Sequence, residues 1–94
     1  MIYYIDTIEQ TKGDENSINE YGKREQWKLS YEQVLSKYFK KLSDVSADIG
    51  EDKKHYYMDI RIVDSNGGVL KKDKVGTYQE EIISEEESDK DSNR

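Results

Sequence analysis

The feature that most constrains the fold of this chain is the alternation of apolar and polar side chains over residues 55–63. In an extended strand every second side chain points to the same face. One face would hold Tyr56, Met58, Ile60 and Ile62, and the other would hold Tyr57, Asp59 and Arg61. The Asn66-Gly67 pair that follows suits a tight hairpin turn, so residues 69–75 are predicted to return as an antiparallel strand. One face of this hairpin must be buried against a second layer.

The second layer is predicted by an apolar stripe with the period of a helix. Apolar side chains recur at spacings of four, three, one, three and four residues, at Trp27, Tyr31, Val34, Leu35, Tyr38 and Leu42. This pattern predicts a helix over residues 23–44, because side chains at such spacings lie along one side of a helix. The polar residues 43–54, which include Gly50, are typical of a loop.

Residues 1–10 are rich in β-branched and aromatic side chains, which favours a strand in the interior of a sheet. A polar stretch at 11–16 supplies turn residues, and the short alternation at 17–21 predicts a second strand. The predicted order is therefore strand, strand, helix, strand, strand. The simplest way to bury both apolar faces is an α+β two-layer sandwich, in which one long helix packs on one face of an antiparallel sheet.

The negative charge of the chain is concentrated at its C-terminal end. The formal net charge is −6, and residues 79–94 contain seven acids against two bases. Like charges that are close in sequence repel one another and resist packing, so we expect an α+β domain at 1–78 and a mobile acidic tail at 79–94. Such a tail suggests a protein that binds a basic partner. The acids are Glu80, Glu81, Glu85, Glu86, Glu87, Asp89 and Asp91.

The sequence favours a non-enzymatic protein with no catalytic, cofactor-binding or metal-binding site. The chain has no cysteine and a single histidine, so a thiolate zinc site and a serine-type catalytic relay both lack their residues. We expect this histidine, His55, to be exposed or half-buried at the start of a strand, without a cluster of partners. The fragment at 64–67 lacks the spaced acids and closing glutamate of a calcium loop, and a hairpin turn explains it better.

The N-terminal segment gives no sign of export or of membrane insertion. Its apolar run over residues 1–5 follows no basic region and ends far short of the ~20 apolar residues that span a bilayer. We therefore expect a cytoplasmic protein that has no membrane partner.

One segment carries a resemblance to known proteins. Its pattern is E-Y-x-x-x-E-x-W-x-x-x-Y-x-x-x-L, then a strand and a D-S-N-G turn, formed by Glu20, Tyr21, Glu25, Trp27, Tyr31, Leu35 and residues 64–67. It resembles a group of short uncharacterised proteins of Firmicutes genomes, phages and mobile elements, with a likeness over residues 1–76 that implies a shared fold. Those proteins usually have a small residue where Trp27 stands, and often a histidine at the position of Glu32. Small size, acidity and this setting are also similar to anti-CRISPR proteins.

The leading hypothesis is a non-enzymatic inhibitor that is encoded by a phage or mobile element and resembles anti-CRISPR proteins. It would bind a basic surface of a bacterial nucleic-acid-handling defence protein, such as a CRISPR effector, and occlude the surface where nucleic acid lies. Carboxylates can take the place of phosphates against arginine side chains. The predicted partner-binding residues are the seven acids of the tail and a second patch on the polar face of the third strand, Tyr57, Asp59 and Arg61.

Two alternatives belong to different classes of protein. Six bases against two acids on the predicted helix suggest a nucleic-acid-binding regulator, with a binding face formed by Lys23, Arg24, Lys28, Lys37, Lys40 and Lys41. The net negative charge opposes direct binding of nucleic acid, so this hypothesis ranks second. The third is a homo-oligomeric module of unknown role, in which sheet edges or the open sheet face pair between copies.

Overall fold

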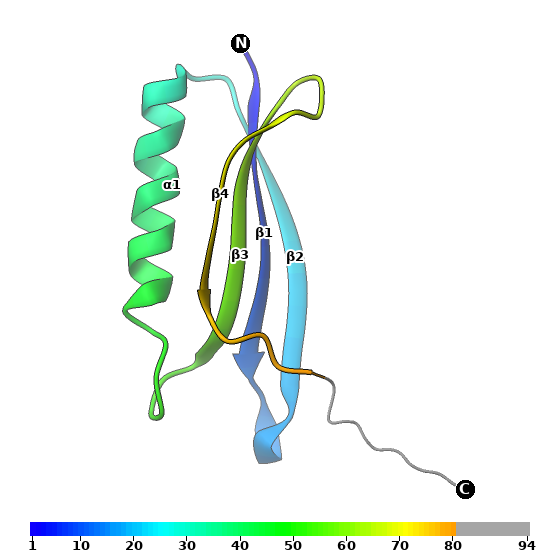
Figure 1. Ribbon diagram of the computed structural model, residues 1–94, viewed down its shortest axis with the longest axis vertical. Helices are drawn as coiled ribbons and strands as arrows, with labels where there is room; N and C mark the ends of the chain where they lie inside the picture. The colour runs from blue at the N-terminus through cyan, green and yellow to red at the C-terminus, as the bar shows by residue number, and fades with distance from the viewer. Residues whose placement is uncertain (81–94) are drawn as a thin grey trace, which may run out of the picture.

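The structure is a computed structural model that describes residues 1–80. In this part of the chain, four antiparallel strands and one helix form two layers: β1 (Tyr3–Lys12), β2 (Ile18–Trp27), α1 (Tyr31–Ser46), β3 (His55–Asp64) and β4 (Val69–Gly76). The strand order is β2-β1-β3-β4, and α1 lies along one face of the sheet (Figure 1). The predicted order of elements and the α+β two-layer class are confirmed.

The core lies between the sheet and α1. The apolar set of β3 is central to it, because Met58, Ile60 and Ile62 are 0 % exposed, whereas Tyr56 is partly exposed. Side chains of β1 and α1 complete the buried cluster: Tyr3, Ile5, Val34, Tyr38 and Val45. We call the opposite side of the sheet, which α1 does not cover, the open face.

The predicted start of the helix at residue 23 is wrong, because residues 18–27 form β2. The second strand is therefore longer than the predicted segment 17–21, and it pairs with β1 along all ten of its residues. Trp27 packs against the core from the end of this strand. Its four-residue spacing to Tyr31 imitates a helical turn, although the two side chains come from different elements.

The helix instead begins at Tyr31, where a capping box satisfies its first backbone amides. Ser30 Oγ accepts a hydrogen bond from the backbone N of Gln33 (3.2 Å), and Gln33 Oε1 accepts one from the backbone N of Ser30 (3.1 Å). At its other end α1 continues to Ser46. The loop predicted over 43–54 therefore occupies residues 47–54.

The hairpin between β3 and β4 confirms the turn predicted at Asn66-Gly67. Asp64 Oδ1 accepts hydrogen bonds from the backbone N of Asn66 (2.9 Å) and of Gly68 (2.8 Å). Gly67 has a φ of +86°, a left-handed conformation that glycine adopts without steric cost. β4 then returns beside β3, as predicted, and forms one edge of the sheet.

Candidate functional site

The acidic C-terminal sequence begins from a segment that is held against the sheet. β4 ends at Gly76, whose φ of +80° turns the chain across the sheet toward β2 (Figure 1). A side chain at this position would clash with the carbonyl oxygen of Tyr56. The backbone N of Thr77 then donates a hydrogen bond to that same oxygen over 2.9 Å. We call residues 77–80 the strap.

Tyr78 and Gln79 fasten the strap to the open face. The Tyr78 ring packs edge-to-face on the Tyr57 ring, with 5.2 Å between the ring centroids. Its hydroxyl donates to Glu20 Oε1 over 3.0 Å, and this hydrogen bond raises the pKa of Tyr78. Gln79 exchanges two hydrogen bonds with the Gln10 side chain: its backbone N donates to Oε1 (2.7 Å), and its backbone O accepts from Nε2 (3.1 Å).

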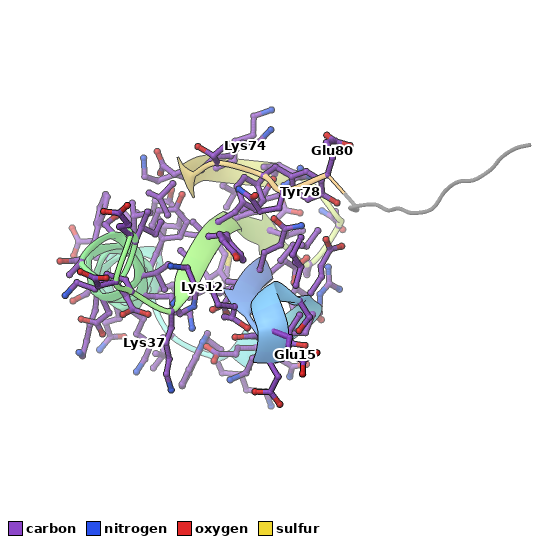
Figure 2. The ribbon with its side chains drawn as sticks, turned by 90° about the horizontal axis from the view of Figure 1, so that it is seen from below. Lys12, Glu15, Lys37, Lys74, Tyr78 and Glu80 are labelled. Atoms are coloured by element: carbon purple, nitrogen blue, oxygen red, sulfur yellow. The ribbon has the colours of Figure 1, made fainter. Side chains whose placement is uncertain are left out.

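The buried amide of Gln10 positions the strap. Gln10 is 2 % exposed, and its Nε2 also donates to Glu20 Oε1 over 2.9 Å. A buried amide whose donors and acceptor are all satisfied is held in one orientation. Glu80 follows at the exposed rim of the molecule, next to Tyr78 (Figure 2). The other six predicted acids lie outside the described residues: Glu81, Glu85, Glu86, Glu87, Asp89 and Asp91.

The patch predicted on the third strand lies on the open face, but most of it is covered. Tyr57 and Asp59 are each only 8 % exposed, because β3 is an interior strand and because Tyr78 packs on Tyr57. Arg61 is exposed, and its Nε donates to Asp59 Oδ1 over 3.1 Å. Burial raises the pKa of Tyr57, and the hydrogen bond to Asp59 raises the pKa of Arg61. Of the three residues predicted for this patch, only Arg61 is therefore accessible to a partner, and Tyr57 and Asp59 are buried.

The six bases predicted on one helix face do not share a face. Lys23 and Arg24 belong to β2, and Lys28 lies between β2 and α1. Neighbouring side chains on a strand point to opposite faces, so Lys23 is on the helix side of the sheet and Arg24 is on the open face. We call residues 1–76, which form the sheet and α1, the body. Lys23 and Arg24 each form an ion pair within it, Lys23 with Glu25 (3.0 Å) and Arg24 with Asp6 (2.7 Å).

The other three bases of that set are on α1, and each contacts another side chain. Lys37 Nζ lies 4.2 Å from the centroid of the Trp27 ring, in a cation–π contact. Figure 2 shows Lys37 on the helix side, pointing away from Lys74 of β4. The two remaining bases form ion pairs, Lys40 with Asp44 (3.1 Å) and Lys41 with Glu9 (3.1 Å). The six bases of the predicted helix face are therefore spread over β2, α1 and the turn between them, and four of the six form ion pairs.

His55 lies at the start of β3 with its side chain 17 % exposed, which confirms the half-buried strand-end position. The expectation that it lacks partners is wrong. Its Nδ1 lies 2.7 Å from Asp48 Oδ2, and its Nε2 lies 2.9 Å from Glu9 Oε1. Glu9 also forms the ion pair with Lys41 and accepts a hydrogen bond from the Tyr21 hydroxyl (3.4 Å). We call these five residues the His55 cluster.

Glu9 is the buried centre of the His55 cluster, with 2 % exposure. Burial raises the pKa of Glu9, but hydrogen bonds and positive charge from His55 and Lys41 outweigh that effect, so its pKa lies below the ordinary value. The hydrogen bond to His55 also lowers the pKa of Asp48. The sequence held one signal of this cluster, because Glu9 is an acid on the core-facing side of a strand, where a charge needs partners.

The described residues 1–80 contain no group of three His, Cys, Asp or Glu side chains that could hold a metal ion. None of the helices in residues 1–80 is long and apolar enough to cross a bilayer. An open cavity of about 350 Å³ lies beside His55 and is lined by loop 47–54 and the strap. That the protein is not an enzyme stays a prediction.

Comparisons of this chain with protein-family models, with curated proteins and with solved structures find no match. The resemblance to short proteins of phages and mobile elements, and to anti-CRISPR proteins, therefore stays a prediction from the sequence pattern.

Proposed function

We propose that this protein is a non-enzymatic inhibitor that binds a basic surface of a bacterial nucleic-acid-handling protein through its acidic C-terminal sequence. The supporting observation is the separation of charge along the chain. Residues 79–94 carry seven acids against two bases, out of a net charge of −6. Several charges on both layers of the body are instead paired with one another, as in Arg24 with Asp6, Lys41 with Glu9 and Arg61 with Asp59.

The strap gives the acidic sequence a fixed origin on the body. Gln79 is bound to the buried side chain of Gln10, and Glu80 follows directly at the rim. The run of acids therefore begins at the surface of the domain, and no linker separates the domain from the first acid. Carboxylates form charge-assisted hydrogen bonds with arginine side chains, which also bind the phosphates of nucleic acid. Inhibition would follow from competition for one basic surface.

The sequence pattern directs the choice of partner. The likeness of residues 1–76 to proteins of phages and mobile elements leads us to propose a bacterial defence protein, encountered in the cytoplasm, and a CRISPR effector is the first to test. Direct binding of nucleic acid is less favoured, because the bases proposed for it are divided between β2 and α1 and most have partners. Self-association through the sheet edges β2 and β4 stays a prediction that light scattering can test.

The experiment compares three full-length proteins: the natural protein, a tail variant and a body variant. The tail variant carries Glu81→Gln, Glu85→Gln, Glu86→Gln, Glu87→Gln and Asp89→Asn. The body variant is its matched control, because it removes the same amount of negative charge at exposed positions of the body. Its substitutions are Asp14→Asn, Glu15→Gln, Glu32→Gln, Glu51→Gln and Asp52→Asn.

Each protein is used to capture partners from a bacterial lysate, and each captured protein is then tested for displacement of bound nucleic acid. We predict that the natural protein and the body variant capture a basic nucleic-acid-binding protein at about 50 mM salt, lose it at about 300 mM, and displace its nucleic acid. The tail variant should neither capture such a protein nor displace its nucleic acid. Equal capture and displacement by the tail variant contradict the proposal.

A further inference from the structure

The His55 cluster joins parts of the fold that are far apart in the sequence. Glu9 is on β1, His55 begins β3, and Asp48 lies in the loop 47–54 that follows α1. Lys41 of α1 and the hydroxyl of Tyr21 on β2 reach the same Glu9 carboxylate. One imidazole ring therefore links the loop, through Asp48, to Glu9 in the interior of the sheet.

Apart from the ring of His55, loop 47–54 is tied to the sheet by hydrogen bonds, and Lys12 Nζ donates two exposed ones, to the carbonyl O of Gly50 (3.2 Å) and of Glu51 (2.6 Å). The backbone N of His55 donates to the carbonyl O of Asp48 (3.1 Å), and the backbone N of Lys12 donates to the carbonyl O of Lys54 (2.8 Å). Ile49 is partly buried against the core, whereas residues 50–54 are exposed. A loop held mainly by exposed hydrogen bonds opens more easily than the strands it rests on. The ring of His55 and the side chain of Ile49 are the buried parts of its attachment.

The geometry of the ring requires two donors. Asp48 Oδ2 lies 2.7 Å from Nδ1, and Glu9 Oε1 lies 2.9 Å from Nε2. A neutral imidazole carries only one N–H, whereas the doubly protonated ring carries an N–H on each nitrogen. Removing one proton would therefore leave one of the two carboxylates facing a ring lone pair. This loss costs more at Glu9, whose side chain is 3 % exposed, than at Asp48, whose side chain is 38 % exposed, so the ring would keep its bond to Glu9 and lose its bond to the loop.

We propose that His55 is a proton-operated latch, which fastens loop 47–54 to β1 when both ring nitrogens are protonated and releases the loop when one proton is lost. The charged groups that face the ring directly are Asp48 and Glu9, with Lys41 and Tyr21 behind Glu9. Two further charged residues line the open cavity beside the ring, Lys12 and Glu51.

While the ring is doubly protonated, its hydrogen bonds and charge favour the charged forms of both carboxylates and hold the pKa of Glu9 and the pKa of Asp48 below their ordinary values. Release would widen the cavity at this end of the molecule, where Thr77 and Gln79 of the strap form part of the lining. The latch does not depend on the proposed partner, since every group in it belongs to the body.

The test uses the natural full-length protein, whose single histidine makes its ring ¹⁵N signals unambiguous. Ring signals and amide protection factors are measured by NMR from about pH 5 to about pH 9. We expect the protection of the His55 and Lys12 amides to fall about tenfold or more as the ring loses a proton, with the same midpoint. The Ile60 amide, in the middle of β3, is the internal control and should show no such step.

The second part of the test uses the variant His55→Gln, because glutamine has a polar side chain that cannot gain a charge. Its loop amides should have low protection that does not vary with pH. The latch is contradicted if loop protection in the natural protein is unchanged across the ring titration. It is equally contradicted if the pH-dependent step persists in His55→Gln, since another group must then cause it.

Discussion

At the residue scale, two neighbouring side chains near the end of β1 fasten other parts of the chain to the two faces of the sheet. Glu9 faces the helix layer and binds His55 and Lys41, whereas Gln10 faces the open side and binds Gln79 of the strap. Each of the two β1 residues is only 2 % exposed. Buried polar groups at these positions are tolerated because they have partners, and removing a partner would leave an uncompensated group.

The lowered pKa of Glu9 predicts a loss of stability in acid. A carboxylate with a lowered folded pKa contributes stability that is present above the ordinary glutamate pKa of about 4.3 and is lost as the pH falls through the folded value. We predict that Glu9→Gln is about 2 kcal/mol less stable than the natural protein near neutral pH, and that the difference shrinks in acid. Urea unfolding from about pH 7 to about pH 3 measures both curves. Parallel curves would contradict this role for Glu9.

The turn at Gly76 predicts that a methyl group added at this position destabilises the protein. Gly76 and Gly67 both have positive φ, at +80° and +86°, but only Gly76 lies against backbone, whereas a Cβ on Gly67 would meet nothing within 4 Å. We predict that Gly67→Ala costs about 1 kcal/mol from backbone strain and that Gly76→Ala costs about 3 kcal/mol or more. Urea unfolding of both variants compares the two costs. Equal losses would mean that the close approach to Tyr56 is unimportant.

At the scale of elements, the boundary between β2 and α1 decides which side chains lie on the helix. Periodicity alone could not place it, because Trp27 packs on the same core as Tyr31 while belonging to the strand. The local signal at this boundary is the capping box at Ser30 and Gln33, which stops the helix from extending toward residue 23.

The two possible starts of the helix predict opposite changes in stability for one substitution at Ser30. If Ser30 is the N-cap, Ser30→Ala should destabilise the protein by about 1 kcal/mol, because the amide of Gln33 loses its acceptor. If residue 30 lay inside a helix, alanine would be neutral or stabilising. The matched control is Ser36→Ala, at an exposed position within α1, which should cost nothing. Thermal or urea unfolding distinguishes the outcomes.

The fold class was predictable because its signals are local. Alternation over residues 55–63 and the Asn66-Gly67 turn each depend on neighbours in the sequence, and both are found in the structure. The His55 cluster and the strap were not predictable in this way. Their partners are brought together only when the sheet forms, as Glu9 meets His55 and Gln10 meets Gln79. Burial of Tyr57 likewise depends on a ring that arrives from the strap.

At the scale of the whole molecule, charge is distributed unevenly between a compact body and the C-terminal sequence. Six of the 13 Lys and Arg side chains in residues 1–80 form ion pairs within the body, which weakens its attraction for a polyanion. The acids that follow the strap have few bases near them in the sequence. Because of this arrangement, we propose that residues 79–94 bind the partner and that the domain holds them in place.

The most direct measurement is a calorimetric titration of an arginine-rich peptide, as a stand-in for the partner's basic surface, into the natural protein, the tail variant and the body variant. We predict that the natural protein and the body variant bind with a Kd that weakens steeply as salt rises. The tail variant should bind at least about tenfold more weakly at about 50 mM salt, with little dependence on salt. If the tail variant binds as tightly as the body variant, the acids beyond the strap do not carry recognition, and the central claim is contradicted.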